Sequence, residues 1–336
     1  DDRAARHRVA PPSARDRAGG EVGVSSGPGS VDSASPESVS PDTVSRGTVR
    51  PGTVGQGTAS SGPAARTRLR VAACQLNSRG DREANLAAAL EMLERAAAAG
   101  ADLAVLPEYV DYLGPAAGEP VPEPVDGSFG RMFADTARRL SMWVIAGSFH
   151  EVGPDPEHTF NTTLVFDRSG ALAGVYRKIH LFDIELAGRP EVSYQESRRV
   201  APGTDVVCVD VEGVRVGLSI CYDLRFPELY RRLAIDGARV VVVPAAFTTH
   251  TGRDHWEVLL RARAIENQCY VVAAGQSGEH DPGRSCYGHS MVVDPWGTVV
   301  AQAVDGPGLV VADLALDRVE RIRAELPSLA NRRLVA

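Results

Sequence analysis

Lysine is almost absent from this chain of 336 residues, because arginine supplies all but one of its 36 basic side chains and Lys178 is the only lysine. A guanidinium stays protonated and forms a wide planar fork, whereas a lysine ammonium is a compact charge whose pKa can be shifted by its surroundings. The retained lysine is either a chance survivor on the surface or a group whose chemistry arginine cannot supply. Because Lys178 follows an apolar run and has aromatic neighbours, we favour the second interpretation.

Several other features are missing. No apolar run approaches the roughly 18 residues of a membrane-spanning helix, and the N-terminus lacks the apolar core of a secretory signal. The five cysteines show no C-x-x-C spacing, which argues against a structural zinc or a disulfide scaffold and favours a reducing cytoplasm. G-x-S-x-G, G-x-G-x-x-G, Walker A and H-E-x-x-H motifs are also absent, which disfavours the enzyme classes that use them.

The first 68 residues contain no leucine, isoleucine, methionine, cysteine or aromatic residue. Such a segment cannot bury enough apolar surface to offset its conformational entropy. We therefore predict a disordered tail over 1–68 and one folded domain over 69–336. The tail has nine arginines and seven acidic residues, a net charge of +2. Because the whole chain has a net charge of −7, the domain carries about −9. An acidic domain with scattered arginines argues against nucleic-acid binding.

Apolar runs and turn signals predict alternating strands and helices after residue 68. The predicted strands are 69–74, 103–105, 143–148, 159–166, 172–176, 206–211, 214–220, 240–243, 270–274, 289–293, 298–302 and 309–313. The predicted helices are 81–99, 127–140, 227–235, 256–267 and 317–324. Most of these strands are apolar on both faces, so each sheet needs a covering layer on either side. We predict an α/β fold of two facing sheets with helices outside, a four-layer α-β-β-α sandwich.

Cys221 stands at the end of the predicted strand 214–220, shortly before a helix predicted from Pro227. A turn from strand to helix exposes a side chain and leaves backbone N–H groups free, which suits a nucleophile and an oxyanion site. A buried structural cysteine is the alternative, and the residues alone leave both open. The eight histidines offer no clear base for such a nucleophile. Glu108, at another strand end, is either solvated or a buried carboxylate with the raised pKa of a general base.

Three segments together resemble the nitrilase superfamily of carbon–nitrogen hydrolases: Leu106–Glu108, Tyr176–Asp183 and Ile220–Glu228. The resemblance extends over about residues 69–333. It implies a catalytic triad of Glu108, Lys178 and Cys221, which we expect to converge in one pocket. The segment Tyr194–Ser197 matches the surroundings of a second glutamate in the family, which implies Glu196 beside the triad.

The resemblance also implies a mechanism that needs no metal and no organic cofactor. Cys221 would attack an amide carbonyl, and Glu108 would move the protons. The Lys178 ammonium and the Tyr222 N–H would stabilise the oxyanion, and water would hydrolyse the resulting thioester. Glu196 would hold Lys178 and the substrate amide in place.

Cys221-Tyr222-Asp223 resembles the amidase branches of the superfamily rather than the true nitrilases, which carry Cys-Trp-Glu. Segments 255–272 and 275–297 are more similar to the deaminated glutathione amidase branch than to the omega-amidases. A small 2-oxo amide and water are therefore the expected substrates, in a metabolite-repair role. Hydrolysis of 2-oxoglutaramate or of an N-carbamoyl compound, and a catalytically silent interaction module, are the alternatives. Asp254 departs from the small residue usual there and bears on specificity. We expect a homodimer or a higher homo-oligomer.

Four further residues are candidates for substrate binding. Arg225 forms either a structural salt bridge with Asp223 or Glu228, or a site for a substrate carboxylate. The others follow the apolar strand 240–243, where a pocket loop is expected: Phe247, Thr248 and Thr249.

Overall fold

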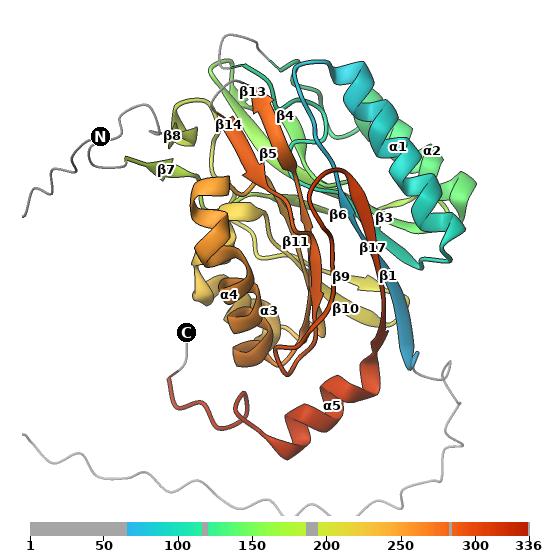
Figure 1. The fold of residues 1–336 in the computed structure, drawn as a ribbon, viewed down its shortest axis with the longest axis vertical. Helices are drawn as coiled ribbons and strands as arrows, with labels where there is room; N and C mark the ends of the chain where they lie inside the picture. The colour runs from blue at the N-terminus through green and yellow to red at the C-terminus, as the bar shows by residue number, and fades with distance from the viewer. Residues whose placement is uncertain (1–65, 116–119, 186–193, 282–283, 335–336) are drawn as a thin grey trace, which may run out of the picture. The chain divides into compact units, whose positions relative to one another are not determined.

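The computed structural model describes residues 66–115, 120–185, 194–281 and 284–334 (Figure 1). The predicted tail lies outside these ranges except for its last three residues. Strand β1 (Arg68–Gln75) begins one residue before the predicted domain boundary. No helix in the described ranges is long and apolar enough to span a membrane.

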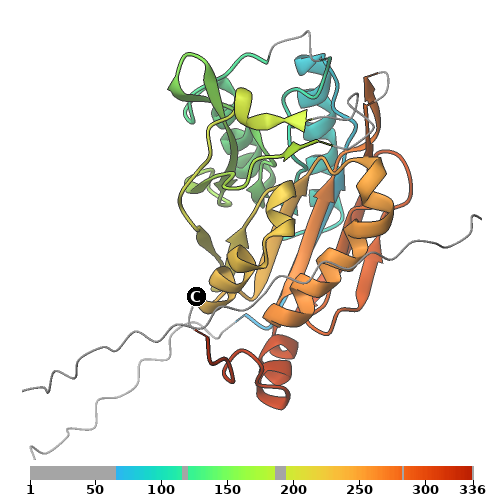
Figure 2. The ribbon, with the colours of Figure 1, turned by 90° about the vertical axis from the view of Figure 1, so that its left-hand side faces the viewer.

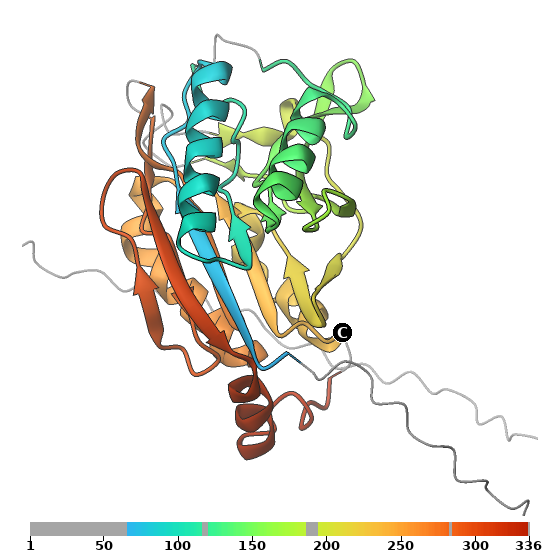
Figure 3. The ribbon, with the colours of Figure 1, turned by 90° about the vertical axis from the view of Figure 1, so that its right-hand side faces the viewer.

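The first sheet has seven strands in the order β17-β1-β2-β3-β5-β4, with β6 pairing with β5. Its strands are β1, β2 (Leu103–Val105), β3 (Trp143–Ile145), β4 (Phe149–Asp155), β5 (His158–Phe166), β6 (Leu172–Arg177) and β17 (Gly308–Ala315). Helices α1 (Arg82–Ala98) and α2 (Ser128–Leu140) cover its outer face (Figure 3). The Asp81 side chain caps α1 by accepting a hydrogen bond from the Ala84 N–H at 3.1 Å, which fixes where the helix begins.

The second sheet has six strands in the order β16-β15-β12-β11-β10-β9. These strands are β9 (Cys208–Val211), β10 (Val214–Leu218), β11 (Val240–Ala245), β12 (Tyr270–Gly275), β15 (Met291–Val293) and β16 (Val299–Gln302). Helices α3 (Pro227–Ile235) and α4 (Thr249–Asn267) cover its outer face (Figure 2). Helix α5 (Leu316–Glu325) follows β17.

Alternation along the strands explains why the two sheets face each other. In β1, Val71 and Ala73 pack in one core with the strands of the second sheet, whereas Ala72 and Cys74 pack against α1 and α2. Successive side chains point to opposite faces of a strand, so one apolar run supplies both cores. The layers therefore run helix, sheet, sheet, helix, and the predicted α-β-β-α sandwich is confirmed (Figure 1).

Several elements differ from the prediction. The strand predicted over 143–148 ends at Ile145, since Gly147 has a φ of +66° and a Cβ there would lie 2.0 Å from the Pro107 carbonyl oxygen. Helix α4 begins seven residues before its predicted start. The prediction missed these residues because 249–255 are polar and bury only Gly252, so they show no apolar periodicity. Four short pieces near the site were not predicted: the hairpins β7 (Asp183–Ile184) with β8 (Tyr194–Gln195) and β13 (Ser277–Asp281) with β14 (Arg284–Tyr287), and the 3₁₀ helices η2 (Glu196–Arg198) and η3 (Cys221–Arg225).

Candidate active site

The candidate site lies where strands of both sheets end. Glu108 follows β2 of the first sheet, Lys178 follows β6 of the same sheet, and Cys221 follows β10 of the second sheet. All three side chains are buried, with relative exposures of 1 % for Glu108, 2 % for Lys178 and 8 % for Cys221. Apolar strands therefore deliver three ionisable groups to one buried position between the sheets.

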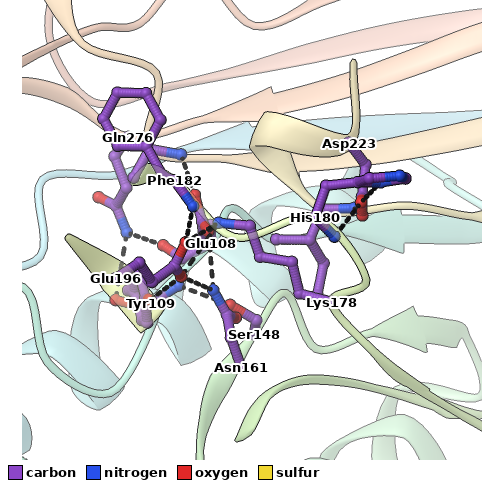
Figure 4. A network of polar contacts seen from close by, with 12 residues as sticks. Glu108, Tyr109, Ser148, Asn161, Lys178, His180, Phe182, Glu196, Asp223 and Gln276 are labelled. Atoms are coloured by element: carbon purple, nitrogen blue, oxygen red, sulfur yellow. Dashed lines mark hydrogen bonds and ion pairs between the residues drawn. The ribbon is translucent and has the colours of Figure 1, made fainter. Parts of the chain in front are cut away.

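The Lys178 ammonium is held between two carboxylates (Figure 4). Its Nζ lies 2.9 Å from Glu108 Oε1 and 2.9 Å from Glu196 Oε2. Burial alone would lower the pKa of Lys178, but the charges of Glu108 and Glu196 raise it well above its usual value. The single lysine of the chain is thus a buried, protonated cation.

Glu108 is fixed at both carboxylate oxygens and at its backbone. Oε1 accepts a hydrogen bond from Asn161 Nδ2 at 2.8 Å, and Oε2 accepts one from the Ala246 N–H at 2.8 Å. The Glu108 carbonyl oxygen accepts a hydrogen bond from Gln276 Nε2 at 2.9 Å. These donors come from segments distant in sequence, and none was predicted. The one sequence signal for them was Asn161, an amide inside the predicted strand 159–166.

Glu196 is the second carboxylate on Lys178 and has its own set of donors (Figure 4). The Tyr109 hydroxyl donates to Oε1 at 2.6 Å, and the Phe182 N–H donates to Oε2 at 2.6 Å. Burial alone would raise the pKa of Glu196, but Lys178, Tyr109 and Phe182 together lower it below its usual value. Glu196 is therefore an ionised carboxylate that faces the ammonium.

Cys221 begins η3 with a φ of +45°, a backbone conformation that is unusual for a residue other than glycine. Burial raises the pKa of its thiol well above the usual value, and the adjacent Glu108 carboxylate, which accepts a hydrogen bond from the thiol, raises it further. Lys178 and the Ala246 N–H act in the opposite direction. At rest the group is thus a protonated thiol in contact with a base.

A buried carboxylate, Asp223, ties the turn at Cys221 to the segment that follows Lys178. Its Oδ2 accepts hydrogen bonds from the Ile220 N–H at 2.9 Å and the Tyr176 hydroxyl at 2.7 Å. Its Oδ1 accepts from the His180 N–H at 3.0 Å and lies 2.7 Å from His180 Nδ1 (Figure 4). Because His180 lies two residues beyond Lys178 and Asp223 two residues beyond Cys221, this pair fixes the spacing of Lys178 and Cys221.

Arg225 does not form either of the predicted salt bridges. Asp223 is occupied by the contacts above, and within the described parts of the chain no carboxylate pairs with Arg225. Its guanidinium instead lies over the Phe247 ring, 5.0 Å from the centroid, and Nη1 is 3.2 Å from His255 Nδ1. A cation beside an aromatic wall and without an acidic partner can accept an anionic ligand.

The expected pocket loop over residues 247–249 is only partly a loop. Phe247 is buried against Trp256, with ring centroids 5.2 Å apart. Thr248 is the N-cap residue of α4, and Thr249 is the first residue of that helix. The expectation that Thr249 lies on a loop was therefore wrong, because α4 starts earlier than its apolar pattern indicates. Tyr222 lies beside Arg225, whose guanidinium is 5.8 Å from its ring centroid. Within the described ranges, no group of three or more His, Cys, Asp or Glu side chains could hold a metal ion.

Comparison with known proteins identifies the family. The family model described as carbon-nitrogen hydrolase matches residues 70–324. The deaminated glutathione amidase of Homo sapiens is 44 % identical over 78 % of this chain and 82 % of its own length, and that of Synechocystis is 41 % identical over 78 % and 97 %.

Solved structures agree with this assignment. The Caenorhabditis elegans NitFhit protein superimposes with a TM-score of 0.73 at 42 % identity, over 80 % of this chain and 66 % of that one. Saccharomyces cerevisiae Nit3, a member of branch 10 of the nitrilase superfamily, gives 0.71 at 32 % identity, over 82 % and 100 %. The site geometry and these likenesses together show that the chain belongs to the carbon-nitrogen hydrolase family.

Proposed function

We propose that this protein hydrolyses the amide bond of deaminated glutathione or a closely related 2-oxo amide through a cysteine thioester. The observation that carries the proposal is the Lys178 ammonium, buried between the carboxylates of Glu108 and Glu196, next to a thiol that contacts Glu108. The relatives named as deaminated glutathione amidases, at 41–44 % identity, support this choice of substrate.

The first half of the reaction uses Glu108 as a base. Glu108 takes the proton of the Cys221 thiol, and the thiolate attacks the amide carbonyl carbon. The Lys178 ammonium and the Tyr222 N–H then stabilise the oxyanion. Tyr222 is the second residue of η3, and the first N–H groups of a helix have no partner within it. Collapse of this intermediate passes the proton from Glu108 to the leaving amine and forms a thioester.

The second half returns the enzyme to its starting state. Glu108 removes a proton from water, and the hydroxide adds to the thioester carbonyl at the same oxyanion site. The carbonyl re-forms, the acid is released, and the Cys221 sulfur recovers its proton. Glu196 stays ionised throughout and keeps Lys178 charged while Glu108 gains and loses protons.

The substrate preference can be tested by measuring amine and ammonia release from a panel of amides. We expect the highest kcat/KM on deaminated glutathione, a lower value on 2-oxoglutaramate, and no turnover of N-carbamoyl compounds. Faster hydrolysis of 2-oxoglutaramate would make the protein an omega-amidase. Turnover of N-carbamoyl compounds alone would refute the proposed function.

We propose that Arg225 binds the carboxylate of the 2-oxo acid end of the substrate. Arg225→Ala should then lower kcat/KM on deaminated glutathione. The loss should correspond to roughly 2–3 kcal/mol of transition-state stabilisation, the value of a lost charge-assisted hydrogen bond. The exposed Arg232 of α3, which pairs only with Asp236, gives a matched control in Arg232→Ala. An Arg225→Ala variant with unchanged kcat/KM would place the carboxylate elsewhere.

We also propose that the protein is a homo-oligomer of a reducing compartment such as the cytoplasm. Val258 and Ile265 of α4 and Ile235 of α3 expose large apolar side chains on one helical layer, which favours self-association. All five cysteines are free. Light scattering on the purified chain would give its oligomeric state.

A further inference from the structure

A cavity of about 430 Å³ with a mixed polar and apolar lining lies beside the N-terminal end of α4 and the β13–β14 hairpin. Its lining includes Thr249, Arg253, Ser277, Cys286 and Tyr287. No step of the proposed mechanism uses it. The volume is within the range of small-ligand pockets, and hydroxyl groups and a guanidinium line a concave surface of the kind that binds a small polar molecule.

Two short stretches of chain connect this cavity to the triad. Ala246 donates its N–H to Glu108, and Thr249 on the cavity wall is three residues later, at most about 11 Å away in Cα position. On the other wall, Ser277 directly follows Gln276, whose side chain donates to the Glu108 carbonyl oxygen. The cavity is therefore within the reach of a substrate whose scissile bond lies at Cys221.

Arg253 is the charged group best suited to bind an anion there. It lies one helical turn beyond Thr249, and no carboxylate forms an ion pair with it in the part of the chain that the structure describes. The one carboxylate on the cavity wall, Asp305, is 3.2 Å from His289 Nε2. The Arg253 guanidinium is thus available for a ligand.

Arg253 lies on a different face of α4 from the residue that contacts Arg225, the arginine proposed for the acyl site. Arg225 contacts His255, and residues 253 and 255 point about 160° apart around a helix. Arg225 and Arg253 therefore flank the N-terminal end of α4 on opposite sides. An amide with an anionic group at each end requires two separated cations, one for the acyl part and one for the leaving group.

We infer that this cavity binds the leaving amine and that Arg253 pairs with its terminal carboxylate, as in a cysteinylglycine released from deaminated glutathione. This inference rests on the proposed function and names the part of the substrate that the second cavity recognises. It adds a peptide carboxylate to the recognition elements of the site and predicts a preference for a peptide-like leaving group over ammonia.

The test compares two substrates that differ only at that carboxylate, deaminated glutathione and its C-terminal carboxamide. The wild-type enzyme should favour the free carboxylate in kcat/KM by roughly tenfold or more, as expected for a charge-assisted pair. In Arg253→Gln this preference should disappear through a loss on the carboxylate substrate alone. Arg232→Gln, the matched surface variant, should keep the wild-type preference.

If Arg253→Gln lost kcat/KM equally on both substrates, or on neither, the leaving-group assignment would be overturned. Hydrolysis of deaminated glutathione by the wild-type enzyme would still support the proposed function. Failure of the wild-type enzyme to hydrolyse either substrate would overturn the proposed function and the inference with it. The distinction needs no assumption about stability, because both substrates are assayed on the same preparation of each variant.

Discussion

Cys221→Ala should abolish amide hydrolysis while the protein stays folded. The variant removes the thiol that lies beside Glu108 and Lys178, so we expect kcat to fall by roughly 10⁴-fold or more. Alanine keeps the Cβ and loses one buried atom, so the melting temperature should change little. Amine release and thermal unfolding, measured on the same samples, check both parts of this prediction.

Cys208→Ala provides the matched control, because Cys208 is a half-buried thiol on β9 that takes no part in the site. It should retain wild-type turnover. Mass spectrometry of the quenched enzyme should detect an acyl adduct on the wild-type protein and on Cys208→Ala, and none on Cys221→Ala. Substantial hydrolysis by Cys221→Ala would contradict a thioester mechanism.

Lys178→Arg should be almost inactive although it keeps the positive charge. The Lys178 Nζ lies 2.9 Å from each of two carboxylates in a fully buried position, and a planar guanidinium is too wide to place one donor at that point. We expect kcat to fall roughly 10²- to 10³-fold, the usual effect of losing an oxyanion donor. Steady-state kinetics on deaminated glutathione measure this loss.

Lys178→Met separates the effect of charge from that of shape. It leaves the buried carboxylates of Glu108 and Glu196 without a cation, so the free energy of unfolding should fall by about 3–5 kcal/mol. Lys178→Arg should lose less stability, because the charge remains. Denaturant titration compares the two variants. If Lys178→Arg kept most of its activity, the proposal that the site requires a compact ammonium would be contradicted.

Much of the fold could be predicted because its strands are continuous apolar runs bounded by turn residues. β12 and α3 match the predicted strand and helix closely, and the apolar β11 required covering layers on both sides. Where a boundary depends on packing rather than on periodicity, the prediction was less accurate. The first two turns of α4 are held by contacts such as Gly252 against Tyr287, which leave no apolar pattern in the sequence.

The site was predicted at a coarser level. Residues at strand ends could be identified one by one, and the family resemblance grouped Glu108, Lys178, Glu196 and Cys221. The groups that orient them could not be predicted, since they act through long-range contacts. The Ala246 donor is a backbone N–H that any residue except proline would supply, and the Asp223–His180 pair joins segments 43 residues apart. Arg225 remained ambiguous until the structure placed Asp223 in other hydrogen bonds.

The division of the site between two sheets has a consequence for folding. Glu108, Asn161 and Lys178 follow or belong to strands of the first sheet, whereas Cys221 and Ala246 follow strands of the second. The sheets also join at this edge, where Leu76 forms a bridge with Gln276. A chain with only one sheet assembled therefore holds either the base and the ammonium or the nucleophile, never all three. Hydrolytic activity during refolding should therefore report the docking of the two sheets, and a chain cleaved between its halves should regain turnover only when both fragments reassociate.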